Sequence, residues 1–172
     1  SGATINPAVT VEIADAFGNR TADTSNVSVT IASGTGTLDG TATVAAVGGL
    51  ATFSGLSIDE ADSFTLQAAS GGLSSDTSAS FTISAAAADA GTSTLSISTN
   101  NQTADGASQN VVQATVLDAG SNPVMGVSVA FAATNSAIVD ATCVTGVSGQ
   151  CSVNVASTVA GTSAISATIS AV

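Results

Sequence analysis

Alternation of apolar and polar residues at every second position is the feature that most restricts how this chain can fold. It is clearest in residues 48–68, where Ala51 and Phe53 alternate with polar neighbours and, after a polar corner, Phe64 and Leu66 do the same. A period of two is that of a β-strand with one buried face, whereas an amphipathic helix repeats about every 3.6 residues. This segment therefore predicts a strand, a turn and a second half-buried strand.

The same alternation recurs along the whole chain and is interrupted by segments rich in Gly, Asn and Asp. These residues favour turns, and their spacing is typical of all-β proteins. No stretch shows the period of a long amphipathic helix. The sequence therefore predicts an all-β fold, with strands at 7–14, 27–31, 43–46, 51–54, 64–68, 79–83, 94–99, 112–116, 127–131, 153–155 and 165–169.

The composition fits thin β-structure better than a large enzyme. The chain has 172 residues, enough for one or two domains. Hydrophobic residues make up 44%, but most of them are alanine and valine, and the chain has neither Trp nor Tyr. Small aliphatic side chains fill the narrow core of a β-sandwich, so we expect sandwich domains.

The charge excludes two classes of partner. The chain has twelve acidic residues and a single basic residue, Arg20, which gives a formal net charge of −11. Nucleic acids and anionic membrane surfaces are bound through Lys and Arg, so neither is an expected partner. No run of 18 apolar residues exists, and we therefore expect no membrane insertion by this segment.

Several kinds of catalytic site are also excluded. The chain has no His and only two Cys, so it lacks the residues for a Ser-His-Asp relay, a Cys-His pair or the usual zinc sites. No glycine-rich phosphate-binding motif follows a strand. We therefore predict that the chain is not an enzyme and needs no cofactor. Ser1 is not preceded by an initiator Met, and no signal peptide follows it, which predicts a mature product or an excised piece of a longer chain.

The two halves of the chain repeat one another with a period of about 100 residues. The turn that contains Asp15 and Asn19 matches the turn that contains Asp118 and Asn122, and Gly49 aligns with a glycine at the corresponding place of the second half. The small residues between the halves read as a linker. The predicted organisation is therefore a first domain at 1–85, a linker at 86–91 and a second domain at 92–172.

The two copies are offset in their frame. The second half begins with a predicted strand at 94–99 that has no counterpart in the first, and the first half ends with one at 79–83 that has no counterpart in the second. The first domain is therefore expected to lack its first strand and the second its last. Unpaired edges near 7–13 and 165–169 would expose backbone groups, so we expect strands from outside the chain to cover them.

Residues 100–131 contain three motifs: ADG at 104–106, V-x-D-A-x-x-N-P-V at 116–124 and GVSVAF at 126–131. With these motifs the segment resembles bacterial Ig-like domains of the intimin and invasin family, and the resemblance continues at 145–157. Residues 7–83 carry it more loosely. The polar corner before Phe64 is similar to the corner of immunoglobulin-like sandwiches where a tyrosine usually stands, although Phe64 has no hydroxyl.

The resemblance implies two tandem immunoglobulin-like β-sandwich domains and a place on the cell surface. In that family such modules mostly serve as extracellular stalks of adhesins. The expected partners are neighbouring Ig-like domains or subunits, which would meet this chain through its open strand edges.

Cys143 and Cys151 lie symmetrically about Val147, on the two sides of a predicted hairpin turn. This spacing would place them opposite each other and within reach of a disulfide. Closing so short a loop contributes about 2–3 kcal/mol on the chain-entropy model. We therefore predict a disulfide and an oxidising compartment.

Two other sets of residues are candidate sites. The acidic cluster of Asp59, Glu60 and Asp62 offers oxygen ligands for calcium, although its spacing matches no known calcium loop and it equally fits a solvated corner. N-glycosylation sequons occur at Asn19, Asn26 and Asn101.

Three functions remain compatible with these observations. The favoured one is a structural or adhesive extracellular module, a tandem segment of a bacterial surface adhesin stalk or fibre. The first alternative is a subunit of an extracellular filament, assembled when a strand of one chain completes a domain of the next. The second alternative is a carbohydrate-binding accessory module, which the lack of Trp and Tyr disfavours.

Overall fold

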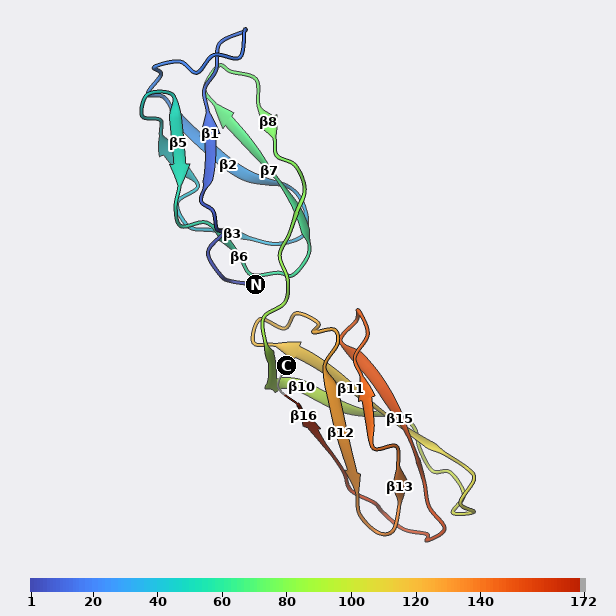
Figure 1. Cartoon of the computed structure of the whole chain (residues 1–172). Coiled ribbons are helices and arrows are strands. Elements are labelled where there is room, and N and C mark those ends of the chain that lie inside the picture. Colours follow the sequence, from blue (N-terminus) through green and yellow to red (C-terminus); the bar gives the residue numbers. More distant parts are fainter. Residues whose placement is uncertain (171–172) are drawn as a thin grey trace. The chain divides into compact units, whose positions relative to one another are not determined.

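The computed structural model describes residues 1–170 and divides the chain into two compact units, Ser1–Ser84 and Ala85–Val172 (Figure 1). Every regular element within the described residues is a β-strand, and all strand pairs are antiparallel. The predicted all-β fold class is therefore confirmed.

Unit 1 contains the strands β1 to β9, arranged in three sheets. One sheet pairs β1 with β5, a second has the order β4-β2-β7-β8 with β9 also paired to β7, and a third pairs β3 with β6. The bounds are β1 Val9–Glu12, β2 Asn26–Ser33, β3 Leu38–Asp39, β4 Thr43–Ala45, β5 Leu50–Phe53, β6 Ser57–Ile58, β7 Ser63–Ser70, β8 Asp76–Thr77 and β9 Phe81–Thr82.

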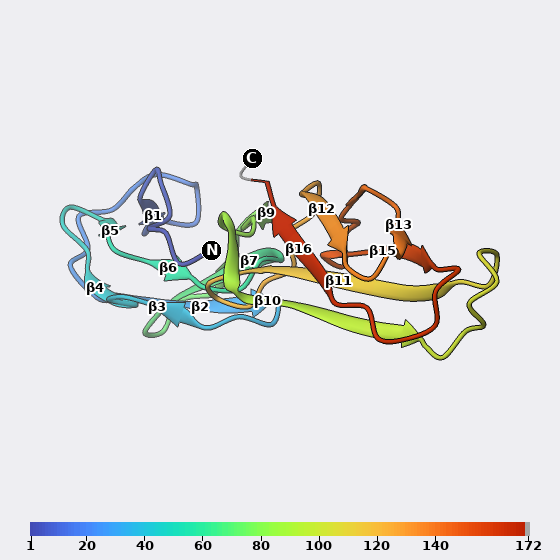
Figure 2. The same cartoon turned by 90° about the horizontal axis from the view of Figure 1, so that it is seen from below.

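Unit 2 contains the strands β10 to β16, arranged in two sheets of order β10-β11-β15-β13 and β14-β12-β16. β10 runs alongside β11 in both views of the chain (Figure 1 and Figure 2). The bounds are β10 Ala88–Thr99, β11 Asn110–Asp118, β12 Ser128–Ala133, β13 Ile138–Val139, β14 Thr142–Val144, β15 Gln150–Ala156 and β16 Ile165–Ile169.

Each unit has its own apolar core, formed by the inward residues of the alternating strands. In unit 1 the core joins side chains of the β1-β5 sheet, such as Phe53, to side chains of the β2-β7 sheet, such as Val29 and Leu66. In unit 2 it is built from Val112, Ala114, Val116, Val127, Val129, Phe131, Val153 and Val155. The period of two read from the sequence thus corresponds to the faces that are buried.

The two units share the register of their central strands. Val9 pairs with Phe53 and Glu12 with Leu50 in unit 1, and the equivalent residues of unit 2 pair as Val112 with Val153 and Thr115 with Gln150. The other sheet repeats as well, with β2-β7 corresponding to β12-β16. The internal repeat is therefore a repeat of strand pairing, and β1 of unit 1 is the equivalent of β11 of unit 2.

The outer strands of the two units differ. β10 pairs with β11 in unit 2, whereas β1, the equivalent of β11, pairs only with β5 among the described residues. On the other sheet, β8 and β9 pair with β7, whereas β16, the equivalent of β7, pairs only with β12 within residues 1–170.

The segment 86–91, which the sequence predicts to be a linker, belongs largely to unit 2. β10 begins at Ala88, which pairs with Asp118, and Asp89 pairs with Leu117. The backbone N–H of Ala86 donates to Asp118 Oδ2 over 2.9 Å. The run of alanines has no periodicity of its own, and its extended conformation depends on hydrogen bonds to a strand that lies much later in the sequence.

Candidate functional site

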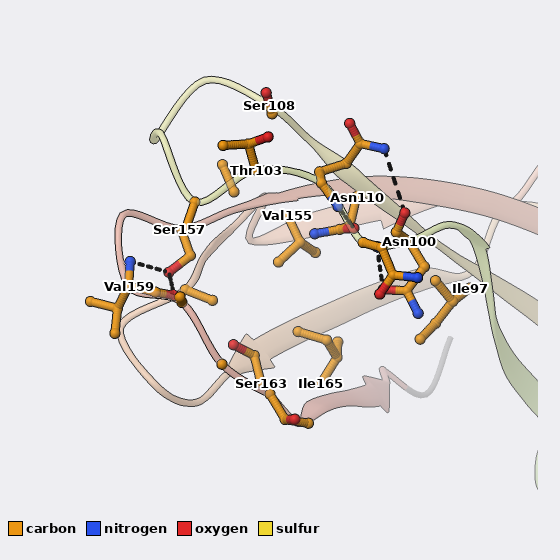
Figure 3. Close-up of a pocket in the computed structure, with 18 of the residues that line it drawn as sticks. Ile97, Asn100, Thr103, Ser108, Asn110, Val155, Ser157, Val159, Ser163 and Ile165 are labelled. Carbon is orange, nitrogen blue, oxygen red and sulfur yellow. Dashed lines mark hydrogen bonds between the residues drawn. The ribbon is translucent and has the colours of Figure 1, made fainter.

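A groove in unit 2 lies between the loop that joins β10 to β11 and the loop that joins β15 to β16 (Figure 3). Its volume is about 370 Å³, and amide, hydroxyl and aliphatic side chains line it, among them Asn100, Asn110 and Ser163. No lining residue is acidic, basic or aromatic. The groove therefore offers no group for proton transfer near neutral pH and no ring on which a sugar could stack.

The polar groups of this groove hold its own loops in place. Asn100 Oδ1 accepts a hydrogen bond from the backbone N–H of Asn101 over 2.8 Å, and Ser157 Oγ accepts one from the backbone N–H of Val159 over 3.0 Å (Figure 3). Asn110 Oδ1 likewise accepts from the backbone of the loop. These side chains act as turn formers.

The acidic cluster expected as a calcium candidate is exposed at the end of unit 1. Glu60 Oε2 accepts a hydrogen bond from Thr35 Oγ1 over 3.1 Å, and Asp62 Oδ1 accepts one from the backbone N–H of Ser63 over 2.7 Å. Within residues 1–170, no three His, Cys, Asp or Glu side chains are placed to hold a metal ion. The structure therefore does not gather Asp59, Glu60 and Asp62 into a coordination sphere.

The three sequon asparagines lie in different surroundings. All of them are exposed, but the Asn19 amide donates to both carboxylate oxygens of Asp15, at 3.3 and 3.2 Å. Asn26 begins β2, and Asn101 lies in a loop with a φ of 62°. Glycosylation at these sites stays a prediction.

Cys143 and Cys151 form a disulfide in unit 2, with their Cα atoms 5.9 Å apart. The expectation that they lie on the two paired strands of one hairpin is wrong. Cys143 lies on β14, which pairs with β12, whereas Cys151 lies on β15, which pairs with β11 and β13. The chain changes sheet at the turn between them, so the disulfide joins the two sheets of unit 2.

Asp118 and Asn122, which mark the internal repeat in the sequence, form a buried polar turn at the end of β11. Asp118 is fully buried, and Asn122 is 6% exposed. The Asp118 carboxylate accepts hydrogen bonds from the backbone N–H groups of Gly120 and Asn122, from the Asn122 amide, and from the backbone N–H of Ala86. This turn therefore binds the segment that leads into β10.

Unit 1 contains the same turn in an exposed setting. Asp15 accepts hydrogen bonds from the backbone N–H groups of Phe17 and Asn19 and from the Asn19 amide. These bonds, with the backbone N–H of Asn19 foremost, hold the pKa of the Asp15 carboxyl below its ordinary value of 3.8. The recurrence of an Asp four residues before an Asn was the sequence signal that could have identified both turns.

Two smaller grooves lie along the edges of β1 and β16, the strands whose neighbours differ between the two units. In unit 1, a groove of about 330 Å³ lies between β1 and β7, lined by Val11, Ile13 and Ala68 and bordered by Asp15 and Asp76. In unit 2, a groove of about 300 Å³ lies between β10 and β16. The strand equivalent to β1 in unit 2, β11, is paired with β10, and the strand equivalent to β16 in unit 1, β7, is paired with β8 and β9.

Comparisons with known proteins identify the second unit. Residues 92–172 match the family model described as bacterial Ig-like domain (group 1), which confirms the resemblance inferred from the sequence for this part of the chain. No curated protein matches the chain. Within residues 1–170, no helix could cross a membrane.

Two solved structures are similar to the chain over most of its length. The D0-D1 domain of intimin matches 94% of this chain and 82% of its own, with 22% identity and a TM-score of 0.42. The crystal structure of invasin, described as a bacterial integrin-binding protein, matches 95% of this chain, with 20% identity and a TM-score of 0.46. The chain covers 33% of the invasin chain.

Proposed function

We propose, from the match of residues 92–172 to the bacterial Ig-like family model, that the whole chain is a tandem Ig-like segment of a bacterial surface adhesin and serves there as part of its stalk. The observation that carries this proposal is the repeated strand register. Because β1-β5 and β2-β7 pair as β11-β15 and β12-β16 do, the architecture of the matched domain extends to unit 1. The chain is then two domains whose boundary in the sequence lies near residue 85.

The chemistry of the described residues supports a structural role. The groove between the β10–β11 and β15–β16 loops has neither ionisable nor aromatic residues in its lining, and the acidic cluster forms no coordination sphere among the described residues. The Cys143–Cys151 disulfide fits an oxidising location outside the cytoplasm. The partners that we propose are neighbouring Ig-like domains, which would meet this chain at the edges of β1 and β16.

Surface display tests this function. The chain is placed between an outer-membrane anchor and an epitope on living bacteria, and its control is the anchor carrying the epitope alone. A stalk segment should make the epitope accessible to a large probe, such as an antibody-coated bead, that reaches the control poorly. It should add no adhesion of its own to host cells or to immobilised glycans.

Two results would overturn the proposal. If the chain without any tip domain attached the bacteria to cells or glycans, it would be a binding module. If the epitope were no more accessible than in the control although the chain was folded on the surface, the spacing role would be excluded.

A further inference from the structure

β10, the first strand of unit 2, is bound to β11 by two different sets of hydrogen bonds. One is the antiparallel ladder, in which Leu95 pairs with Ala114 and Ile97 with Val112. The other lies at the start of the strand, where the ladder is interrupted. There Thr92 Oγ1 donates to the Asp118 carbonyl over 2.9 Å, Ser93 Oγ accepts from the backbone N–H of Leu117, and the Asp118 carboxylate accepts from Ala86.

Unit 1 has the same receiving surface with no strand on it among the described residues. Residues 9–15 are the equivalents of 112–118, because both sets pair in the same register with the next strand and end in the same Asp turn. Val9 and Val11 are half-buried and Asp15 is exposed, whereas their equivalents Val112, Ala114 and Asp118 are buried. Val9, Val11 and Asp15 are therefore more exposed than their equivalents, as expected if unit 1 lacks the strand that corresponds to β10.

The groove of unit 1 lies on this surface. It has a volume of about 330 Å³ and runs from Val11 and Ile13 to Asp15, the residues that in unit 2 correspond to those covered or capped by the start of β10. An unpaired strand edge beside an apolar groove is a surface that recognises an extended peptide through backbone hydrogen bonds.

We propose that β1 and the turn at 15–19, here called the Asp15 turn, together form an acceptor site for an extended strand. This strand resembles β10 in sequence and adds antiparallel to β1. In the register of unit 2, the equivalent of Leu95 faces Val11, the equivalent of Ile97 faces Val9, and a backbone N–H before the strand donates to the Asp15 carboxylate. The proposal rests on the stalk function proposed above, and it names the partner and the residues that receive it.

The occupant is defined by its chemistry. It begins with small residues whose backbone N–H is free to bond a carboxylate, as Ala86 does, continues with two hydroxyl residues such as Thr92 and Ser93, and ends with alternating aliphatic residues. Its source is a preceding repeat of the same polypeptide. We commit to that source because β10 itself follows directly on the preceding unit of its own chain.

The test supplies the strand covalently. By the offset between the equivalent turns, Ser1 corresponds to position 104, so the sequence of residues 85–103 is placed directly before Ser1. The control carries the same residues in scrambled order.

The measurement is hydrogen exchange of the β1 amides Val9–Glu12, together with the thermal unfolding of unit 1. The fused strand should slow exchange at the open edge of β1 by about tenfold or more and raise the unfolding temperature of unit 1. The scrambled strand should do neither.

A second variant isolates the Asp15 turn. Asp15→Ala should reduce the stabilisation given by the fused strand, beyond the loss that the same change causes in the unfused chain. If the fused and scrambled strands protected β1 equally, or if Asp15→Ala cost the same in both contexts, the acceptor site would be disproved. If the unfused chain formed dimers whose β1 amides became protected with rising concentration, a second copy would be the occupant and the proposed source would be wrong.

The surface-display assay is independent of these measurements. Failure of the fused strand with a functioning spacer would remove only the acceptor site. Protection of β1 in a chain that fails as a spacer would remove only the stalk function.

Discussion

Asp15 and Asp118 occupy the same position in two copies of one turn, yet their surroundings differ. Each accepts a hydrogen bond from the backbone N–H of the Asn four residues later and two from its side-chain amide. Only Asp118 also accepts the backbone N–H of Ala86, and it is fully buried. A buried carboxylate that loses its donors, or buried donors that lose their carboxylate, destabilise a fold far more than the same loss in water.

Replacement of Asp118 by alanine is therefore expected to destabilise unit 2 by about 3 kcal/mol, because it leaves several backbone N–H groups without an acceptor. Unfolding in denaturant is followed by far-ultraviolet circular dichroism, since the chain has no Trp or Tyr. The matched control is Asp15→Ala, which removes an exposed carboxylate from the same turn and should cost unit 1 much less. Equal losses in the two units would contradict the role given to burial.

The free energy of unfolding at acidic pH is expected to depend on three aspartates. The pKa values of Asp15, Asp23 and Asp105 lie below their ordinary value of 3.8, since hydrogen bonds favour the ionised forms. The leading donors are the backbone N–H of Asn19, the hydroxyl of Ser25 and the backbone N–H of Ser108, respectively.

Because these folded-state pKa values are lowered, the stabilisation is fully present above the unfolded pKa and is lost as pH falls through the folded one. Stability should thus be constant with respect to these groups near neutrality and decline below about pH 4. NMR titration of the carboxyl carbons, with thermal unfolding at each pH, checks this. Titration of all three groups at or above 3.8 would contradict it.

At the scale of the elements, the turns that carry the chain from one sheet to the other use glycine for a steric reason. Gly48 and Gly49 both have positive φ, but they differ in their surroundings. A Cβ on Gly49 would overlap the carbonyl oxygen of Thr21, whereas one on Gly48 would meet nothing within 4 Å. The carbonyl of Gly49 also accepts the backbone N–H of Ile13, which ties this turn to the end of β1.

The pair separates backbone strain from close packing. Both Gly48→Ala and Gly49→Ala suffer the strain of a positive φ. Gly49→Ala should destabilise unit 1 by about 2 kcal/mol more than Gly48→Ala, because only there must the packed backbone move. Chemical denaturation of the two variants provides the comparison. Equal effects would show that the approach of Gly49 to Thr21 can relax without cost.

The Cys143–Cys151 disulfide joins side chains of the two sheets of unit 2. Replacing Cys143 and Cys151 together by serine should lower the stability of unit 2 by about 2–3 kcal/mol, the chain-entropy value for so short a loop. A reducing agent should have a similar effect on the unaltered chain and none on unit 1, which contains no cysteine. Calorimetry with and without reductant measures both, and a shift of both units would contradict the assignment.

At the scale of the whole molecule, the limits of the folded unit differ from the limits of the family match. The match begins at residue 92, whereas unit 2 begins at Ala85 and draws Ala86, Ala88 and Asp89 onto β11 and its turn. The few residues between these limits include Ala86, whose backbone N–H donates to the buried carboxylate of Asp118.

A fragment of residues 85–172 is accordingly expected to fold alone and to be more stable than a fragment of residues 92–172, by about 1–3 kcal/mol. Parallel denaturation curves measure the difference. As a control, Asp118→Ala should reduce it, because the carboxylate that binds Ala86 is then absent from both fragments. Fragments of equal stability would show that β10 is held from Thr92 onward without help from the residues before it.

Features that depend on which side chains face the core were predictable from the sequence. The period of two placed Ala51, Phe53, Phe64 and Leu66 on the buried faces where the structure has them. The offset repeat likewise indicated strands at both ends of the junction between the halves. These are local properties, because a strand alternates its faces whatever its partner is.

Only the tertiary structure decided which strands pair and which polar groups are buried. The alanine-rich segment 86–91 has no pattern of its own and becomes part of a strand through bonds to residues near 118. Cys143 and Cys151 are neighbours in sequence that the fold assigns to different sheets. Asp15 and Asp118 have nearly the same local sequence, and only one of them is covered. Strand pairing and burial depend on contacts between residues far apart in the chain, so a local pattern does not contain them.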